Sequence, residues 1–73
     1  MTTKIEITIS SDLDYENLIA ELTMGGEFLG LVTNEPQIGF RFEVPENTVS
    51  EITIELDKFI EALNEAKAEL LVR

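Results

Sequence analysis

The spacing of apolar residues changes once along the chain, and this change constrains the fold more than any other feature. Up to about residue 56, apolar residues tend to alternate with polar ones, which is typical of β-strands with one buried face. From Leu56 to Leu70 they recur every three or four residues, which is the period of an amphipathic helix. A run of strands followed by one helix predicts an α+β fold, with the helix on one face of the sheet.

Four segments carry the strand pattern, at about residues 4–9, 18–24, 28–33 and 38–44. The second and third are joined by Gly25-Gly26, and two glycines can both take positive φ without steric cost, so a hairpin is expected there. The residues around Ile52 and Ile54 also alternate, which leaves a fifth strand open. We therefore expect an antiparallel meander of four to five strands in a single domain of residues 1–73.

The helix is expected at about residues 56–71, with Asp57 in the first turn, where the helix dipole favours an acid. The apolar residues on one side of this helix are Leu56, Phe59, Ile60, Leu63, Ala66 and Leu70. We expect it to pack on the sheet through Leu56, Phe59, Ile60, Leu63 and Leu70. Its polar side carries acids at every fourth position, namely Asp57, Glu61, Glu65 and Glu69. Acids spaced in this way lie about 6 Å apart along the helix axis. The row either imitates nucleic-acid phosphates or is simply the solvated side of the helix.

A regular hairpin around Gly25-Gly26 would divide the neighbouring residues between the two faces of the sheet. The face under the helix is then expected to carry the pairs Leu22–Leu29, Ala20–Leu31 and Leu18–Thr33. The other face carries Ile19, Phe28 and Val32, for which one helix provides no cover. These residues are expected either to be scattered over the surface or to contact another chain, for instance in a homodimer. A one-residue bulge would exchange the two faces.

Charge and composition restrict the partners. Fifteen acidic and five basic residues give a net charge of −10, which repels nucleic acid and anionic membrane surfaces. This charge either keeps the protein soluble or attracts a protein partner with a basic surface. The N-terminal residues lack the apolar segment of a signal peptide, and no apolar run is long enough to cross a membrane. A cytoplasmic location, with neither a membrane nor a nucleic acid as direct partner, is expected.

The sequence offers no recognisable catalytic chemistry. Cysteine and histidine are absent, so disulfides and thiolate or imidazole metal sites are excluded, and no nucleophile has an evident base. Asp12, Asp14 and Glu16 are spaced as in a calcium loop, but Asn17 stands where that loop needs glycine and Thr23 where it needs glutamate. A turn is the better interpretation of these residues. We expect a protein without enzymatic activity, cofactor or metal.

Three segments carry a resemblance to a known family: residues 14–22, 26–32 and 56–67, which read DYENLIAEL, GEFLGLV and LDKFIEALNEAK. In these segments the chain resembles a family of small uncharacterised bacterial proteins, some of which are similar to immunity proteins of toxin–immunity systems. The resemblance implies a binding protein and no catalytic residues.

The functional expectation is an acidic protein-binding or inhibitor module that is immunity-like. The alternatives are a phage or mobile-element protein that counters host defence by imitating nucleic acid, and a structural domain that assembles with itself. Aromatic residues and arginine dominate protein interfaces energetically. The candidate contacts are therefore Tyr15, Ile19, Phe28, Val32 and Arg41, together with the helix acids Asp57, Glu61, Glu65 and Glu69.

Overall fold

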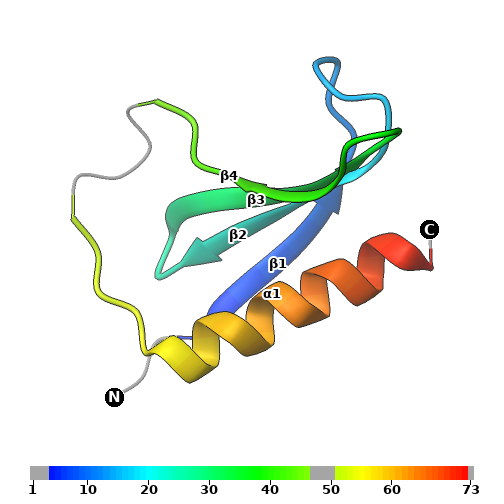
Figure 1. Cartoon of the computed structure of the whole chain (residues 1–73). Coiled ribbons are helices and arrows are strands. Elements are labelled where there is room, and N and C mark those ends of the chain that lie inside the picture. The colour runs from blue at the N-terminus through cyan, green and yellow to red at the C-terminus, as the bar shows by residue number, and fades with distance from the viewer. Residues whose placement is uncertain (1–3, 47–50, 73) are drawn as a thin grey trace.

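Four strands and one helix follow one another in the order that the sequence predicts. The computed structural model describes residues 4–46 and 51–72. The strands are β1 (Ile5–Ser10), β2 (Ile19–Met24), β3 (Glu27–Glu35) and β4 (Gly39–Glu43), and the helix is α1 (Leu56–Leu71). Each strand is hydrogen-bonded antiparallel to its neighbour in sequence, in the order β1-β2-β3-β4. Figure 1 shows α1 across one face of this sheet, so the predicted α+β meander with a C-terminal helix is confirmed.

The hairpin between β2 and β3 turns on two glycines, as predicted. Met24 pairs with Glu27, so only Gly25 and Gly26 lie between the strands. Both have positive φ, 59° and 84°, which is the conformation that a two-residue type I′ turn requires. The residues around Ile52 and Ile54 form no strand. Both side chains are instead partly buried against the core from an extended segment that leads into α1.

A β-bulge interrupts the same hairpin and corrects the predicted faces. Thr23 pairs with Phe28 as expected, but Leu22 pairs with Gly30, so Leu29 is an extra residue in β3. Leu29 itself lies in the core, on the face predicted for it, but beyond Leu29 the side chains of β3 point to the opposite face from the one predicted. Ala20 therefore pairs with Val32 instead of Leu31. The predicted pairs Leu22–Leu29, Ala20–Leu31 and Leu18–Thr33 are wrong.

Gly30 is needed at the bulge because two groups of β4 approach its backbone closely. An added Cβ would lie 2.6 Å from Cζ of Phe42 and 2.7 Å from the carbonyl oxygen of Glu43. The Phe42 ring thus occupies the space that a side chain at position 30 would fill. From there it meets the ring of Phe59 edge-on, with the centroids 5.5 Å apart.

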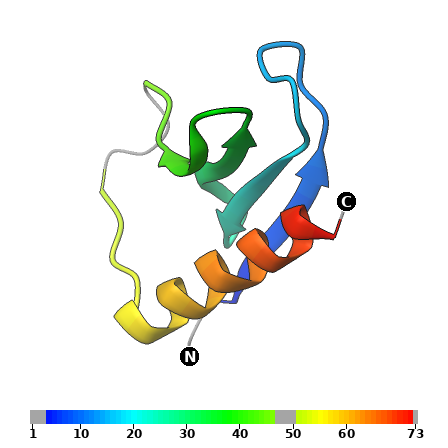
Figure 2. The ribbon, with the colours of Figure 1, turned by 45° about the vertical axis from the view of Figure 1, so that its right-hand side comes forward.

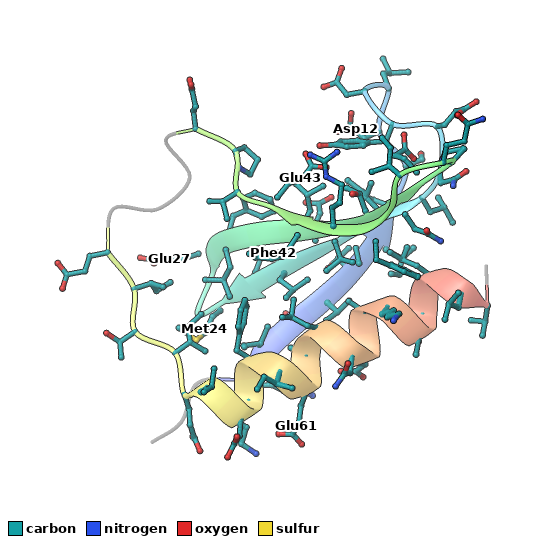
Figure 3. The ribbon with its side chains drawn as sticks, in the orientation of Figure 1. Asp12, Met24, Glu27, Phe42, Glu43 and Glu61 are labelled. Atoms are coloured by element: carbon teal, nitrogen blue, oxygen red, sulfur yellow. The ribbon has the colours of Figure 1, made fainter. Side chains whose placement is uncertain are left out.

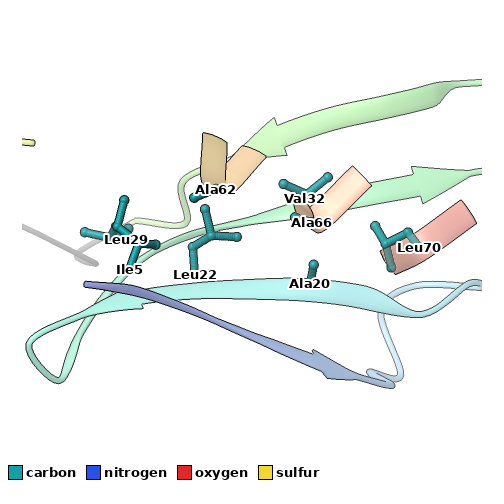
Figure 4. Close-up of a cluster of buried hydrophobic side chains, with 8 residues drawn as sticks. All are labelled: Ile5, Ala20, Leu22, Leu29, Val32, Ala62, Ala66 and Leu70. Atoms are coloured by element: carbon teal, nitrogen blue, oxygen red, sulfur yellow. The ribbon is translucent and has the colours of Figure 1, made fainter. Parts of the chain in front are cut away.

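The core lies between the sheet and α1 (Figure 4). Its buried members are Ile5, Ala20, Leu22, Leu29, Val32, Ala62, Ala66 and Leu70. Side chains from β1, β2, β3 and α1 contribute, and α1 packs against those three strands. Val32 is therefore a core residue, only 5 % exposed, and it does not share a face with Ile19 and Phe28 as the regular hairpin predicted.

The helix begins as expected, and three of its predicted contacts with the core are confirmed, since Leu70 is buried and Phe59 and Leu63 are partly buried against the core. Asp57 lies in its first turn. Ala62 and Ala66 are buried against the sheet, whereas Leu56 and Ile60 are 68 % and 45 % exposed, so their predicted packing is wrong. The two alanines point toward the sheet instead, and their small side chains allow the helix backbone to approach it closely.

Candidate functional site

The loop between β1 and β2, residues 11–18, folds over the sheet face that α1 leaves open. The side chain of Asp12 accepts a hydrogen bond from the backbone N–H of Asp14 through Oδ1, at 2.8 Å. The N–H of Tyr15 donates to the carbonyl oxygen of Asp12, at 3.1 Å. This tight turn reverses the chain, as expected of these aspartates. Figure 2 shows the loop on the side of the sheet away from α1.

Two carboxylates of the sheet hold this loop in place. The Tyr15 hydroxyl donates to Oε1 of Glu43 at 3.0 Å, and Oε2 of Glu43 accepts from the buried hydroxyl of Thr33 at 3.1 Å. At the other end of the loop, Glu35 accepts the backbone N–H groups of Glu16 and Asn17, at 2.7 Å and 2.9 Å. The Asn17 side chain also donates to the carbonyl oxygen of Asn34. Hydrogen bonds to charged acceptors are stronger than neutral ones, so these bonds fix the loop.

A depression of about 320 Å³ remains between the loop and the sheet. Its floor is apolar, formed by Ile19, Phe28 and Leu31, and carboxylates stand around it. The residues that line it are Asp12, Asp14, Tyr15, Ile19, Glu21, Phe28, Leu31 and Pro45. Ile19 and Leu31 are buried, at 3 % and 5 % exposed, because the loop covers them. This face therefore offers a lined hollow, not the flat apolar patch that the sequence suggested.

The hollow attracts cations and repels anions. Asp12, Asp14 and Glu21 line it, and Glu43 stands beside it through its bond to Tyr15. Arg41 belongs to the same sheet face, since it pairs with Thr33 in the strand register. Carboxylates gathered around a low-dielectric floor raise the local concentration of positive groups. Figure 3 shows Asp12 and Glu43 together on this side, whereas Glu61 points away from the outer side of α1.

The environment of Tyr15 raises the pKa of its phenol above the ordinary value of 10.0. Partial burial is the largest cause, because it disfavours the charged phenolate. The hydrogen bond donated to Glu43 needs the protonated phenol, and the charges of Glu43, Asp12 and Asp14 repel a phenolate. The protonated phenol is thus the form that holds the loop on the sheet.

The titration of Tyr15 gives a first testable prediction. Because its folded pKa is raised, Tyr15 contributes stability that is complete below pH 10 and is lost as the pH rises through the folded-state pKa. Tyr15 is the single tyrosine and tryptophan is absent, so near-ultraviolet absorbance follows this one group. We expect its midpoint above 10.0, and a lower midpoint in Glu43→Gln.

The control for this titration is Glu61→Gln, a charge removal on the outer side of α1 that should leave the midpoint unchanged. A Tyr15 midpoint that responds equally to both substitutions would mean that net charge, and not the bond to Glu43, sets the pKa.

The structure brings together some of the predicted contact residues and separates others. Tyr15, Ile19 and Phe28 line the same hollow, and Arg41 lies on the same face. Val32 lies beneath the helix, on the other side of the sheet. Asp57, Glu61 and Glu65 are exposed and Glu69 is partly buried, on α1 and therefore away from the hollow. Successive acids of this row turn by about 40° around the helix axis, so the row winds around the helix.

Several residues that line or border the hollow were not predicted from the sequence to contact a partner. Asp12 and Asp14 were considered as calcium ligands and as turn residues, Leu31 was assigned to the face under the helix, and Glu21 and Glu43 were not considered as binding residues. Leu31 could have been found by allowing for a bulge before it, since the bulge moves it beside Ile19. No local pattern identifies Glu43, because it lies 28 residues after Tyr15 in the sequence and the two side chains meet only in the folded chain.

Within residues 4–46 and 51–72, no group of three or more acidic side chains is arranged to hold a metal ion. In the same part of the chain, no helix is long and apolar enough to span a membrane. Comparisons with protein families, curated proteins and solved structures gave no match.

Proposed function

We propose that this protein is a non-catalytic binding module of the inhibitor or immunity type, which recognises a basic protein surface in the cytoplasm. The observation that carries the proposal is the hollow under the loop, whose floor is apolar and whose rim is acidic. A lysine or arginine side chain has the complementary form, with an apolar stem and a cationic end. Such a side chain of the partner would place its stem against Phe28, the partly exposed residue of the floor, and its charge among the carboxylates.

Three features support a binding role for this face over a merely solvated one. The loop is held by hydrogen bonds at both ends, so little ordering is needed when a partner binds. Tyr15 and Phe28 both line the hollow, and aromatic side chains commonly anchor interfaces and attract cations. The net charge of −10 would steer a basic partner toward the molecule from a distance.

Binding of an oligolysine peptide tests this proposal, with an oligoglutamate peptide of equal length as the negative probe. We expect amide chemical-shift changes in the protein to cluster around Tyr15, Glu21 and Leu31. The double variant Asp12→Asn, Asp14→Asn keeps the side-chain oxygens that form the turn but removes two charges. It should bind oligolysine roughly two- to thirty-fold more weakly, since an exposed charge pair contributes about 0.2–1 kcal/mol.

The matched control is the double variant Glu61→Gln, Glu65→Gln, which removes the same charge from the outer side of α1. It should weaken binding much less. The opposite pattern, with the helix variant losing affinity and the loop variant keeping it, would reject the hollow. That result would favour the alternative in which the helix acids imitate nucleic-acid phosphates.

A further inference from the structure

The outer edge of the sheet at β4 is a second surface, which adjoins the hollow at Glu43. Within the described residues, β4 is hydrogen-bonded to β3 and to no strand on its other side. The helix packs mainly against β1, β2 and β3, and it meets β4 through the contacts of Phe59 with Phe42 and of Lys67 with Phe40. The unpaired backbone groups of such an edge are a template for another strand unless they are protected.

The side of β4 that faces α1 is apolar and partly open. A groove of about 200 Å³ lies between β4 and the helix, lined by Val32, Phe40, Arg41, Phe42, Leu63, Asn64 and Lys67. Phe42 is 38 % exposed, and Val44, directly after the strand, is 55 % exposed. Exposed Leu56 and Ile60 lie on the same flank of α1 as Leu63 and Lys67, because they are spaced by four, seven and eleven residues. An apolar strip therefore runs beside the edge.

We propose that a second copy of this chain adds its own β4 to this edge, antiparallel, with the two Phe42 residues opposite each other. In this register Arg41 lies opposite Glu43 of the partner subunit, and the two-fold axis makes the same ion pair twice. Phe40 then lies opposite Val44 of the partner subunit. The two four-stranded sheets become one continuous sheet, with both helices on the same side.

The arrangement of charges along β4 indicates a second copy of this chain as the binding partner. A two-fold interface must be complementary to itself, and the alternation of Arg41 and Glu43 around Phe42 satisfies this requirement. Opposite charges directly across a pair of strands stabilise it, whereas like charges destabilise it. A register centred on Arg41 would instead place two guanidinium groups opposite each other. The apolar strip on α1 adds area that the edge strands alone do not supply.

The mass of the protein in solution tests this inference. Sedimentation equilibrium at near-physiological ionic strength, where the Debye length is about 8 Å and the net charge is largely screened, should show a concentration-dependent rise from 8.2 kDa toward twice that mass. Arg41→Glu and Glu43→Arg should each raise the dimer dissociation constant roughly tenfold or more, because each places like charges opposite each other.

Mixing the two variants gives the sharpest result. In a mixed dimer, one chain has glutamate at positions 41 and 43 and the other chain has arginine at both positions. Each glutamate then lies opposite an arginine. The mixture should therefore dimerise about as strongly as the wild type, although each variant alone dimerises roughly tenfold or more weakly. A mixture that stays monomeric would overturn the proposed register, and a wild-type protein that stays at 8.2 kDa at all concentrations would overturn the dimer.

A further variant is needed because Glu43→Arg also removes the acceptor of Tyr15 and Thr33. Val44→Lys leaves those bonds in place and should weaken the dimer by placing a charge opposite Phe40 of the partner subunit. If Val44→Lys associates as strongly as the wild type, the edge is not the interface. Circular dichroism of each variant confirms that the monomer remains folded.

Discussion

Replacing Leu22 with alanine is expected to lower the free energy of unfolding by about 2–5 kcal/mol, the range for truncating a buried leucine. Leu22 is fully buried between the sheet and α1. A domain of this size has a thin core, and native proteins are stable by only about 5–15 kcal/mol. The variant should therefore lose a large part of its stability. Urea denaturation followed by circular dichroism measures the change.

Leu56→Ala is the matched control for this measurement. It is the same chemical change, at a residue that is 68 % exposed, so it should alter stability by less than about 0.5 kcal/mol. The pair also tests the side of α1 that packs on the sheet, since the helical pattern alone predicted Leu56 as buried. Equal losses of stability in the two variants would show that α1 packs on the sheet through the side that carries Leu56.

Gly30→Ala should be destabilising by about 1–3 kcal/mol, as expected when a methyl group is forced into a packed region. The new Cβ would come within 3 Å of both the Phe42 ring and the carbonyl oxygen of Glu43. Gly30 also has a φ of 156°, which residues with a side chain rarely adopt, so backbone strain adds to the clash. Thermal or urea denaturation of the single variant gives the value.

A double-mutant cycle with Phe42→Leu separates the two contacts of position 30. Leucine is shorter than the ring, so it should relieve part of the clash, and Gly30→Ala should cost less in that background. The carbonyl oxygen of Glu43 remains close, so the relief should be incomplete. A Gly30→Ala variant as stable as the wild type would contradict the close approach of β4 to the bulge.

The elements themselves could be predicted because their signals are strong and local. The strand-like alternation, the Gly25-Gly26 turn and the helical spacing after Leu56 each depend on residues only a few positions apart. The alternation of β4 between Arg41 and Phe42 was equally clear. These features determine secondary structure and, for a meander, also the order of the strands.

What could not be predicted depends on one inserted residue and on small side chains. A glycine inside a strand often marks a bulge, but Gly30 alone does not separate a bulged hairpin from a regular one, and that difference moves Val32 into the core and Leu31 to the hollow. Likewise Ala62 and Ala66 carry little hydrophobic weight in a periodic pattern, but they allow the closest packing. The predicted apolar side therefore included Ala66 but omitted Ala62, and it extended to Leu56 and Ile60, which are exposed.

The candidate site was only partly visible in the sequence. Tyr15 and Phe28 were selected because of their side-chain type, which is a local property. That they share a hollow with Asp12 and Glu21 depends on the loop folding back over the sheet, and this in turn depends on acceptors 18 to 28 residues further along the chain. Long-range hydrogen bonds of this kind produce no periodic pattern in the sequence.

The order in which these contacts can form has a kinetic consequence. Every strand pairs with its neighbour in sequence, so the sheet can grow by successive local steps, which favours fast folding. The loop, in contrast, can attach only after β3 and β4 present Glu35 and Glu43. Its bonds are thus expected to be absent from the folding transition state and to open first in the native protein. Amide hydrogen exchange at Glu16 and Asn17 would report this local opening. The hollow is thus expected to form late in folding and to be the first part of the native protein to open.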